Sequence, residues 1–275
     1  MDYFKARITR MEIPARDHAI LRFTRVSNNF PFPTQGKAGM GSRGDSDIEG
    51  EPGQFVMVRG SWGAHPILPR AFSLVEVGKE GAILVRNVGE GTNLLASMKQ
   101  GDELLVLGPL GHGFSLPSET GGGVALVAGG VGVAPLVFLA QRLADTGIEQ
   151  VFLYGARTGD DLPLRDRIDG ICDLTITTED GSVGEKGLVT TPLERFLQAN
   201  PSASVFSCGP EAMLEAVARV SVAAGARCQV ALESPMACGM GVCKGCAILD
   251  VSGEYKYVCS DGPAFESVKI FGHES

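Results

Sequence analysis

Short runs of alternating apolar and polar side chains make up the first part of the chain, with glycine and proline between the runs. Alternation with a period of two is typical of strands that bury one face. The pattern predicts six strands, at residues 4–13, 19–26, 54–58, 71–77, 82–88 and 102–107, and one short helix at residues 92–99. Six short strands with a single helical insert favour a small antiparallel β-barrel.

Residues 28–53 interrupt this pattern between the second and third predicted strands and are rich in Gly, Pro, Ser and Asp. This composition predicts a loop, and its length is unusual for a connection within a compact domain. The simplest interpretation is a solvated loop that has no role in the chemistry of the protein.

From residue 121 onward the periodicity changes. Apolar runs predict strands at residues 124–128, 150–156, 173–180, 204–210 and 228–233, and helical periodicity predicts helices at residues 136–146, 162–168, 191–198 and 210–222. Gly147 follows the first of these helices, at a position where glycine commonly ends a helix. Strands that alternate with helices predict a parallel α/β sheet covered on both faces.

The chain has 275 residues, 44% of them apolar and 20% charged, which fits two globular domains with a small appendage. A formal net charge of −8 argues against nucleic acid or an anionic membrane surface as a general partner. No apolar run reaches the length of a membrane span and no signal-peptide core is visible, so a cytoplasmic protein is expected. Seven cysteines, four of them grouped, fit a reducing compartment better than a disulfide framework.

Four cysteines lie close together near the C-terminus, with the spacing C-x4-C-x2-C and a fourth Cys after twelve further residues. They are Cys238, Cys243, Cys246 and Cys259. This is the plant-type spacing of a [2Fe–2S] cluster. Residues 248–258 predict a hairpin with its turn at Ser252-Gly253, which returns the fourth cysteine to the other three. A structural zinc site and plain buried cysteines are the alternatives, although zinc sites usually contain two similar C-x2-C pairs.

The sequence GGVGVAP at residues 129–135 follows a predicted strand and opens a predicted helix. In that setting, backbone N–H groups and the helix N-terminus can bind a pyrophosphate. Pro135 stands where the dinucleotide fingerprint has a third glycine, and Arg157, not an acidic residue, follows the second strand. The spacing alone is therefore compatible both with a dinucleotide site and with a tight structural turn.

Two further segments are candidates for phosphate binding. Arg70 begins the sequence RAFSL at the start of a predicted strand, where an arginine can pair with a phosphate and the next residues can meet a ring system. The sequence GEGT at residues 89–92 precedes the short helix, with Thr92 as its expected N-cap. Taken singly, an ordinary strand with a surface arginine and a plain helix cap explain these two segments better than phosphate binding does.

The order of all these motifs is more specific than any one of them. RAFS, LVR, GEGT, LGPLGHGF, GGVGVAP, YGART, CGP and the cysteine loop ending in VCSDGPAF follow one another along nearly the whole chain. In this the chain resembles the ferredoxin-NADP reductase superfamily and, within it, the electron-transfer subunits of class B, NAD-dependent dihydroorotate dehydrogenase. The resemblance implies an antiparallel FAD-binding β-barrel at residues 1–118, a Rossmann-like parallel α/β NAD-binding domain at 119–231 and a small [2Fe–2S] subdomain at 232–275. The insert at 28–53 departs from the family pattern.

The resemblance also implies cofactors and site residues: one FAD, one [2Fe–2S] cluster held by the four cysteines, and NAD(H) as an exchangeable substrate. The residues expected at FAD are Arg70, Ala71, Phe72, Ser73, Leu84, Val85, Arg86, Gly91 and Thr92. Those expected at the nicotinamide nucleotide are Gly130, Gly132, Cys208, Gly209 and Pro210. Ser73, near flavin N5, and Cys208, beside the hydride path, are the two expected at the reacting atoms. Cys172 and Cys228 are expected to be core residues of strands.

The function implied is electron transfer from dihydroorotate oxidation, in a partner subunit that carries FMN, through the cluster and FAD to NAD+, in de novo UMP biosynthesis. The assembly implied is a heterotetramer of two plus two, and the chain alone should not oxidise dihydroorotate. Alternatives in the same class are a subunit of NADH-dependent ferredoxin:NADP oxidoreductase or of a sulfide dehydrogenase. A non-enzymatic module with structural zinc is the alternative in a different class. NADH and NADPH are not distinguished, because Arg157 is compatible with a 2′-phosphate.

Overall fold

The computed structural model describes residues 1–26, 47–116 and 122–272. The loop predicted at residues 28–53 therefore lies mostly outside the described residues. At its described end, Ile48 is 5% exposed and forms an antiparallel bridge with Gly78. This end of the insert is packed against the barrel.

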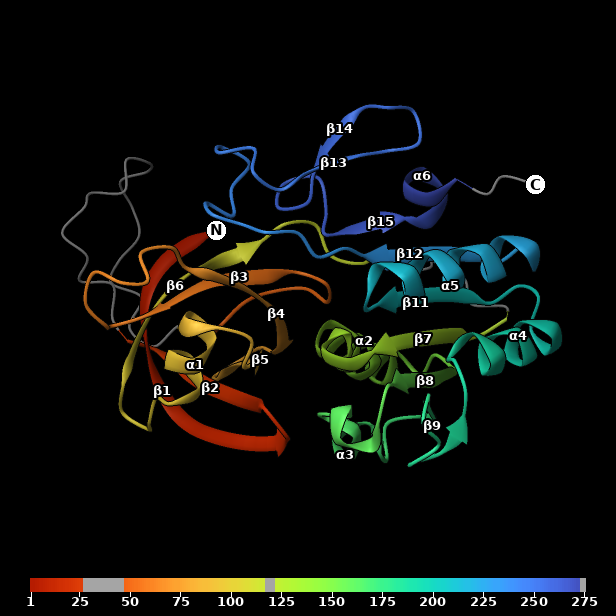
Figure 1. Ribbon diagram of the computed structural model, residues 1–275, viewed down its shortest axis with the longest axis horizontal. Coiled ribbons are helices and arrows are strands. Elements are labelled where there is room, and N and C mark those ends of the chain that lie inside the picture. Colours follow the sequence, from red (N-terminus) through yellow and green to blue (C-terminus); the bar gives the residue numbers. More distant parts are fainter. Residues whose placement is uncertain (27–46, 117–121, 273–275) are drawn as a thin grey trace.

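The N-terminal part is a closed antiparallel barrel, as the alternating pattern predicts (Figure 1). Its strands are β1 (Asp2–Ala15), β2 (His18–Val26), β3 (Phe55–Gly60), β4 (Arg70–Glu76), β5 (Gly81–Arg86) and β6 (Glu103–Leu110). They pair in the order β1-β2-β5-β4-β3-β6, and β6 closes the barrel on β1. The short helix α1 (Glu90–Ala96) follows β5 and begins two residues before its predicted start.

The second part is a mostly parallel sheet in the order β10-β9-β8-β7-β11-β12-β15. Its strands are β7 (Val124–Gly129), β8 (Gln150–Ala156), β9 (Asp173–Thr178), β10 (Glu185–Lys186), β11 (Ser204–Cys208), β12 (Arg227–Ala231) and β15 (Ala264–Glu266). From β7 the chain adds β8 and β9 on one side and then returns to add β11 and β12 on the other. This is the doubly wound order of dinucleotide-binding folds, in which ligands bind at the carboxyl ends of the strands where the order reverses.

Helices cover both faces of this sheet, as predicted from the alternation of strands and helices. Side chains of β7 alternate between the faces: Leu126 packs in the same apolar cluster as α2 (Val133–Thr146), and Val127 packs with α4 (Thr190–Ala199) and α5 (Glu211–Ala223). Gly147 ends α2 with φ of 73°, a left-handed conformation that favours glycine. Pro135 lies in the first turn of α2, where its missing N–H would have no helical partner.

The barrel and the sheet share a continuous apolar junction. Phe138 of α2 belongs to the barrel core, whereas Ile20, Val75 and Leu84 of the barrel belong to the core around α2. In Figure 1 the barrel and the sheet lie side by side, and the C-terminal cysteine region lies across one edge of both. Helix α2 therefore fixes one side of the contact between the two parts.

The C-terminal region is partly built into the parallel sheet. The predicted hairpin is present as β13 (Ala247–Leu249) and β14 (Tyr255–Tyr257). Strand β15 then pairs antiparallel with β12, and α6 (Ser267–Phe271) packs beside α5. The sequence pattern missed β10, β15 and α6, because segments of two to five residues are too short to show a periodicity. The domain limits at residues 118 and 231 stay a prediction.

Candidate functional site

A cavity of about 470 Å³ lies at the carboxyl ends of β7, β8, β9 and β11, against the barrel. Gly130 follows β7, and Gly209 and Pro210 follow β11, so the cavity occupies the point where the strand order reverses. His18 and Arg86, which pair in the register of β2 and β5, line it from the barrel side.

Two of the predicted glycines have different structural reasons, a close backbone approach at Gly132 and a positive φ at Gly130. A Cβ on Gly132 would lie 2.2 Å from the carbonyl oxygen of Cys208, so only glycine lets the turn after β7 meet the end of β11. Gly130 has φ of 53°, and no atom lies within 4 Å of the position of a Cβ there. The structure thus brings together the five residues predicted at the nicotinamide nucleotide. They are Gly130, Gly132, Cys208, Gly209 and Pro210.

Tyr154 of β8 makes a hydrogen bond to this turn. Its side chain is fully buried, and its hydroxyl lies 3.0 Å from the carbonyl oxygen of Gly130 and 2.9 Å from that of Pro163. Burial, with a smaller contribution from Asp161, raises the pKa of Tyr154 well above its usual value, so the hydroxyl keeps the proton that it donates. Tyr154 begins the sequence YGART, and no local pattern in the sequence indicates this contact.

Cys208 is 2% exposed at the end of β11. Burial, and secondarily the charge of Glu233, raises the pKa of its thiol well above the usual value. A protonated, buried thiol is a weak nucleophile. The chemistry therefore favours a role for Cys208 in packing beside the ligand over bond formation, and the predicted role at the hydride path stays a proposal.

Charged residues that the sequence analysis did not assign also line the cavity: His18, Asp161, Glu179 and Glu233. Desolvation raises the pKa of Glu233. Glu179 and Glu233 stand just beyond the ends of β9 and β12. Their place at the ends of the strands predicted at residues 173–180 and 228–233 was a usable signal, because the carboxyl ends of parallel strands meet at the same edge.

Because of His18, we expect the free energy of unfolding to depend on pH. It is 4% exposed and its Nδ1 makes a hydrogen bond with the Arg16 carbonyl, and burial is the main cause that lowers its pKa below the usual 6.5. As the pH falls below 6.5, the unfolded chain takes up a proton that folded His18 does not, so the free energy of unfolding decreases until the lowered pKa is reached.

We expect His18→Gln to reduce this acid-side loss in urea unfolding measured at several pH values. His112, for which no such burial is seen, provides the control variant His112→Gln, whose profile should match that of the wild type. Equal pH profiles for all three proteins would contradict the prediction.

Two of the residues predicted at FAD, Arg70 and Gly91, are in contact on the barrel. A Cβ on Gly91 would lie 2.2 Å from Cζ and Nε of Arg70, so the guanidinium group packs directly on the start of α1. Arg70 Nη1 also donates to the carbonyl of Leu68. Arg70 and Gly91, which are far apart in the sequence, are thus brought together as a cradle that suits a pyrophosphate.

The expectation that Thr92 is the N-cap of α1 is wrong. The N-cap is Gly89, and Thr92 is the third residue of the helix. The Thr92 hydroxyl accepts hydrogen bonds from the amides of Val88 and Gly89, at 2.9 and 3.0 Å, and donates to the Gly89 carbonyl. Thr92 therefore shapes the turn before α1.

Strand β4 presents its predicted residues to different surroundings. Phe72 packs against the barrel core, whereas Ala71 packs against a separate apolar cluster that contains Cys246 and Cys259. Ser73 is half-buried and pairs with Phe55 of β3. The strand expected to contact the flavin thus shares an apolar cluster with the cysteine loop.

On β5, the three predicted flavin residues diverge. Val85 is fully buried in the barrel core, so any flavin contact would involve its backbone. Leu84 is 6% exposed and faces the junction with α2. Arg86 lines the nucleotide cavity. The structure therefore places Arg86 on the barrel side of the nucleotide cavity.

The hairpin returns the fourth cysteine to the loop, as predicted. The sulfur atoms of Cys246 and Cys259 are 3.2 Å apart and buried, whereas Cys243 is exposed. Backbone N–H groups point at three of the sulfurs: those of Met240 and Cys243 at Cys238, that of Gly241 at Cys259, and that of Cys259 at Cys246. Amides directed at thiolates are the interactions that stabilise an iron–sulfur cluster.

The titration of these cysteines also fits a cluster. Burial raises the pKa of Cys238, but the amides of Cys243 and Met240 outweigh it and lower the value to about 7. Burial and the neighbouring Cys246 raise the pKa of Cys259 to about 12, so this sulfur becomes a thiolate at neutral pH only beside a bound cation. Within the described residues, no group of three His, Cys, Asp or Glu side chains is placed so that it could hold a metal ion. Cys228 is buried in β12 as predicted, but Cys172 is half-buried in a bend before β9 and not in a strand.

Two family models match the chain. Residues 233–271 match the iron–sulfur cluster binding domain of dihydroorotate dehydrogenase B, and residues 126–219 match the oxidoreductase NAD-binding domain. The chain is 38% identical over 223 residues to the "Dihydroorotate dehydrogenase B (NAD(+)), electron transfer subunit" of Caldanaerobacter subterraneus. The aligned region covers 80% of this chain and 86% of that protein. The chain belongs to the family of dihydroorotate dehydrogenase B electron transfer subunits. The subunit of the same name from Bacillus cereus is 40% identical over 224 residues, covering 78% of this chain and 85% of that protein.

Solved structures agree with this family assignment. The structure described as "Insights into flavin-based electron bifurcation via the NADH-dependent reduced ferredoxin-NADP oxidoreductase structure" matches 96% of this dihydroorotate dehydrogenase B family member and 89% of that chain, with a TM-score of 0.78 and 27% identity. A ferredoxin reductase in carbazole 1,9a-dioxygenase matches 82% of this chain and 66% of its own, with a TM-score of 0.66 and 18% identity, and so supports the fold alone. The predicted family, fold and oxidoreductase class are confirmed, and the predicted FAD, [2Fe–2S] cluster and NAD(H) agree with these matches.

Among the helices of the described residues, none is long and apolar enough to cross a membrane.

Proposed function

We propose that this chain is the subunit that transfers electrons from dihydroorotate oxidation in a partner subunit to NAD+, for de novo UMP synthesis. The observation that carries the proposal is the position of β4. This strand holds Arg70 and Ser73 of the proposed FAD site, and its Ala71 packs in the same apolar cluster as two of the cysteines. When bound, FAD supplies hydride exchange with the nicotinamide and the [2Fe–2S] cluster supplies single-electron transfer.

The residues of the chain bind and orient these groups. Arg70, packed on Gly91, pairs with the FAD pyrophosphate, and Ser73 donates a hydrogen bond near flavin N5. The turn at Gly130 binds the NAD(H) pyrophosphate at the N-terminal end of α2. Gly209 and Pro210 bound the cavity at the nicotinamide end, with Cys208 packed behind them.

The partner subunit, which we propose carries FMN in a complex of two plus two, docks over the cysteine loop. Met240 and Val242 of this loop are 43% and 76% exposed, beside the exposed Cys243. Exposed apolar side chains around a redox centre suit a protein interface that excludes water.

Val242→Asp should weaken binding of the catalytic subunit about tenfold or more, because a charge would be buried at the contact. Ile13→Asp provides the control, because Ile13 is 83% exposed on barrel strand β1 and should leave affinity unchanged. The measurement is titration calorimetry of the two subunits with iron and FAD contents determined for each variant. Equal affinities for wild type and Val242→Asp would place the interface elsewhere.

The proposed relay is tested on the isolated chain, purified without oxygen. We expect one FAD and one two-iron cluster per chain. The chain should reduce an artificial dye with NADH, and it should not reduce NAD+ with dihydroorotate. Dihydroorotate oxidation by the chain alone would contradict the proposal. A colourless protein with bound zinc would support the non-enzymatic alternative.

A subunit of an NADH-dependent ferredoxin:NADP oxidoreductase is the second candidate, favoured by the likeness to the solved structure with a TM-score of 0.78. The identity to that structure is 27%, against 38 to 40% for the curated relatives. Reduction of the cluster by ferredoxin but not by a dihydroorotate-oxidising subunit would favour this second candidate.

A further inference from the structure

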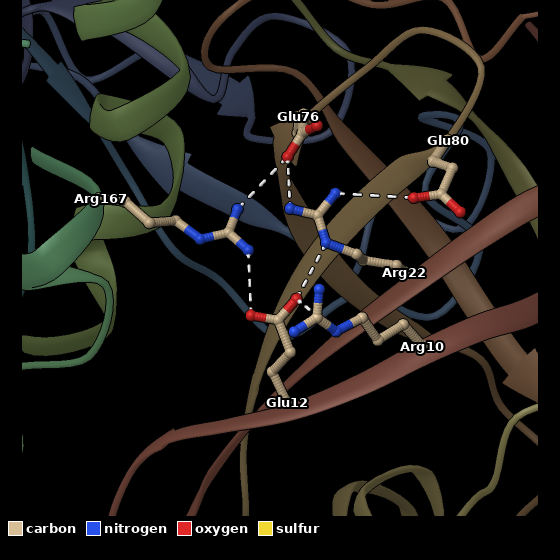
Figure 2. A network of polar contacts seen from close by, with 6 residues as sticks. All are labelled: Arg10, Glu12, Arg22, Glu76, Glu80 and Arg167. Atoms are coloured by element: carbon tan, nitrogen blue, oxygen red, sulfur yellow. Dashed lines mark hydrogen bonds and ion pairs between the residues drawn. The ribbon is translucent and has the colours of Figure 1, made fainter.

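Three arginines and three glutamates form a charged network across the junction of the barrel and the α/β domain (Figure 2). Five of them lie on or beside barrel strands: Arg10, Glu12, Arg22, Glu76 and Glu80. The sixth, Arg167, lies on α3 (Arg165–Ile168) of the α/β domain. Figure 2 shows Arg167 reaching across to two barrel carboxylates that Arg22 also contacts.

The contacts of the network are short and paired. Arg167 Nη1 lies 3.3 Å from Glu76 Oε2, and its Nη2 lies 3.4 Å from Glu12 Oε2. Arg22 holds the same two carboxylates from the other side, with Nη2 2.8 Å from Glu76 Oε2 and Nε 3.0 Å from Glu12 Oε1. Each guanidinium therefore bridges both carboxylates, a fork geometry that a lysine cannot reproduce.

Three of the six groups are partly removed from water, which distinguishes them from ordinary surface ion pairs, whereas Glu76 is 45% exposed. The side chains of Arg22, Arg167 and Glu12 are 16%, 24% and 25% exposed. Burial alone would raise the pKa of Glu12, but the hydrogen bond from Arg22 and the charges of Arg167 and Arg10 lower it below the usual value. Glu12 therefore stays ionised at neutral pH and holds Arg167.

The segment before Arg167 contributes one residue to a wall of the nucleotide cavity. Asp161 lines the cavity, and the Pro163 carbonyl lies 2.9 Å from the Tyr154 hydroxyl, which also contacts Gly130. Leu164 follows with φ of 64°, a conformation that costs energy for a residue with a Cβ and persists only where its surroundings hold it. The wall is thus held by Tyr154 on one side and by Arg167 on the other.

We propose that Arg167 is a positioning residue, which fixes the nucleotide-cavity wall against the FAD barrel and thereby sets the distance between nicotinamide and flavin. Helix α2 fixes the junction through Phe138, and Arg167 supplies a second fixed point beside the cavity. The apolar junction around α2 holds the two parts together, and Arg167 adds a charged contact to the segment that carries Asp161. Hydride exchange needs reacting atoms about 3–3.5 Å apart, so a small displacement of this wall reduces the rate strongly. This inference rests on the proposed exchange of hydride in this cavity.

The test uses Arg167→Met, which keeps the length of the side chain and removes the charge. Arg165→Met is the matched control on the same helix, because Arg165 is 48% exposed and pairs with the adjacent Asp166. We expect Arg167→Met to lower kcat for NADH-dependent dye reduction by about tenfold to a hundredfold. The long-wavelength charge-transfer absorbance of NAD+ stacked on reduced flavin should fall with it, while FAD and iron contents stay normal.

Two further variants separate positioning from general stability. Glu76→Gln removes one of the two carboxylates, and its effect should be less than additive with that of Arg167→Met because both break the same contact. Arg167→Lys should restore only part of the rate, since one ammonium cannot bridge both carboxylates. If Arg167→Met does not fold, the charge-transfer absorbance of Glu76→Gln provides the same test.

A variant Arg167→Met that melts earlier but keeps kcat and the charge-transfer absorbance would overturn the inference, because the network would then be structural only. An inactive wild type would instead contradict the proposed function. The two failures are therefore distinguishable in one experiment.

Discussion

Cys243→Ser should remove the iron–sulfur cluster and abolish partner-dependent electron transfer while FAD and NADH-dependent dye reduction remain. A serine oxygen is a poorer ligand for iron than a thiolate. Cys243 is exposed on its loop, so the substitution should leave the fold intact. Iron analysis, the visible spectrum and dye reduction measure the three properties separately.

Cys172→Ser is the control for this variant, because Cys172 lies half-buried in the α/β domain and outside the cysteine loop. It should keep both iron and turnover. Full iron content in Cys243→Ser would remove Cys243 from the ligand set, and loss of FAD with normal iron would show that the loop serves the flavin instead.

Arg70→Ala should purify with little FAD. The guanidinium of Arg70 packs on Gly91 in the proposed pyrophosphate cradle, and loss of a charge-assisted phosphate contact costs about 1.5–3 kcal/mol. FAD affinity should therefore fall roughly tenfold to a hundredfold. Flavin released by denaturation, compared with protein concentration, gives the occupancy directly.

Arg7→Ala provides the matched arginine control, since Arg7 is 52% exposed on β1 and pairs with Glu103. It should leave FAD occupancy unchanged. Normal occupancy in Arg70→Ala would show that the cradle on α1 does not hold the pyrophosphate, even if the barrel binds FAD elsewhere.

Local patterns were sufficient to predict most elements of this fold. In β7, apolar side chains at every position indicate a strand buried on both faces, and α2 and α5 cover those faces in the structure. The cysteine spacing is similarly local, because three ligands lie on one loop and a hairpin of eleven residues, 248–258, returns the fourth. Such signals need no knowledge of how distant strands are ordered.

The remaining features depend on that order. The contact between Gly132 and Cys208 requires β7 and β11 to be neighbours, and the ion pair of Glu12 with Arg167 joins residues 155 positions apart. No spacing in the sequence encodes either contact. Thr92 was misplaced for a different reason: a threonine hydroxyl can contact the amides before a helix from the N-cap or from the third helical position, and here it does so from the latter.

The most direct test of the electron-transfer function is an assay of dihydroorotate-dependent NAD+ reduction by the purified complex. The chain is expressed with its dihydroorotate-oxidising partner, the complex is isolated, and NADH formation is followed with and without dihydroorotate. We predict NADH and orotate in equal amounts from the complex and none from either subunit alone. A complex that oxidises dihydroorotate with a dye but never reduces NAD+, or a chain that binds no such partner, would contradict the proposed function.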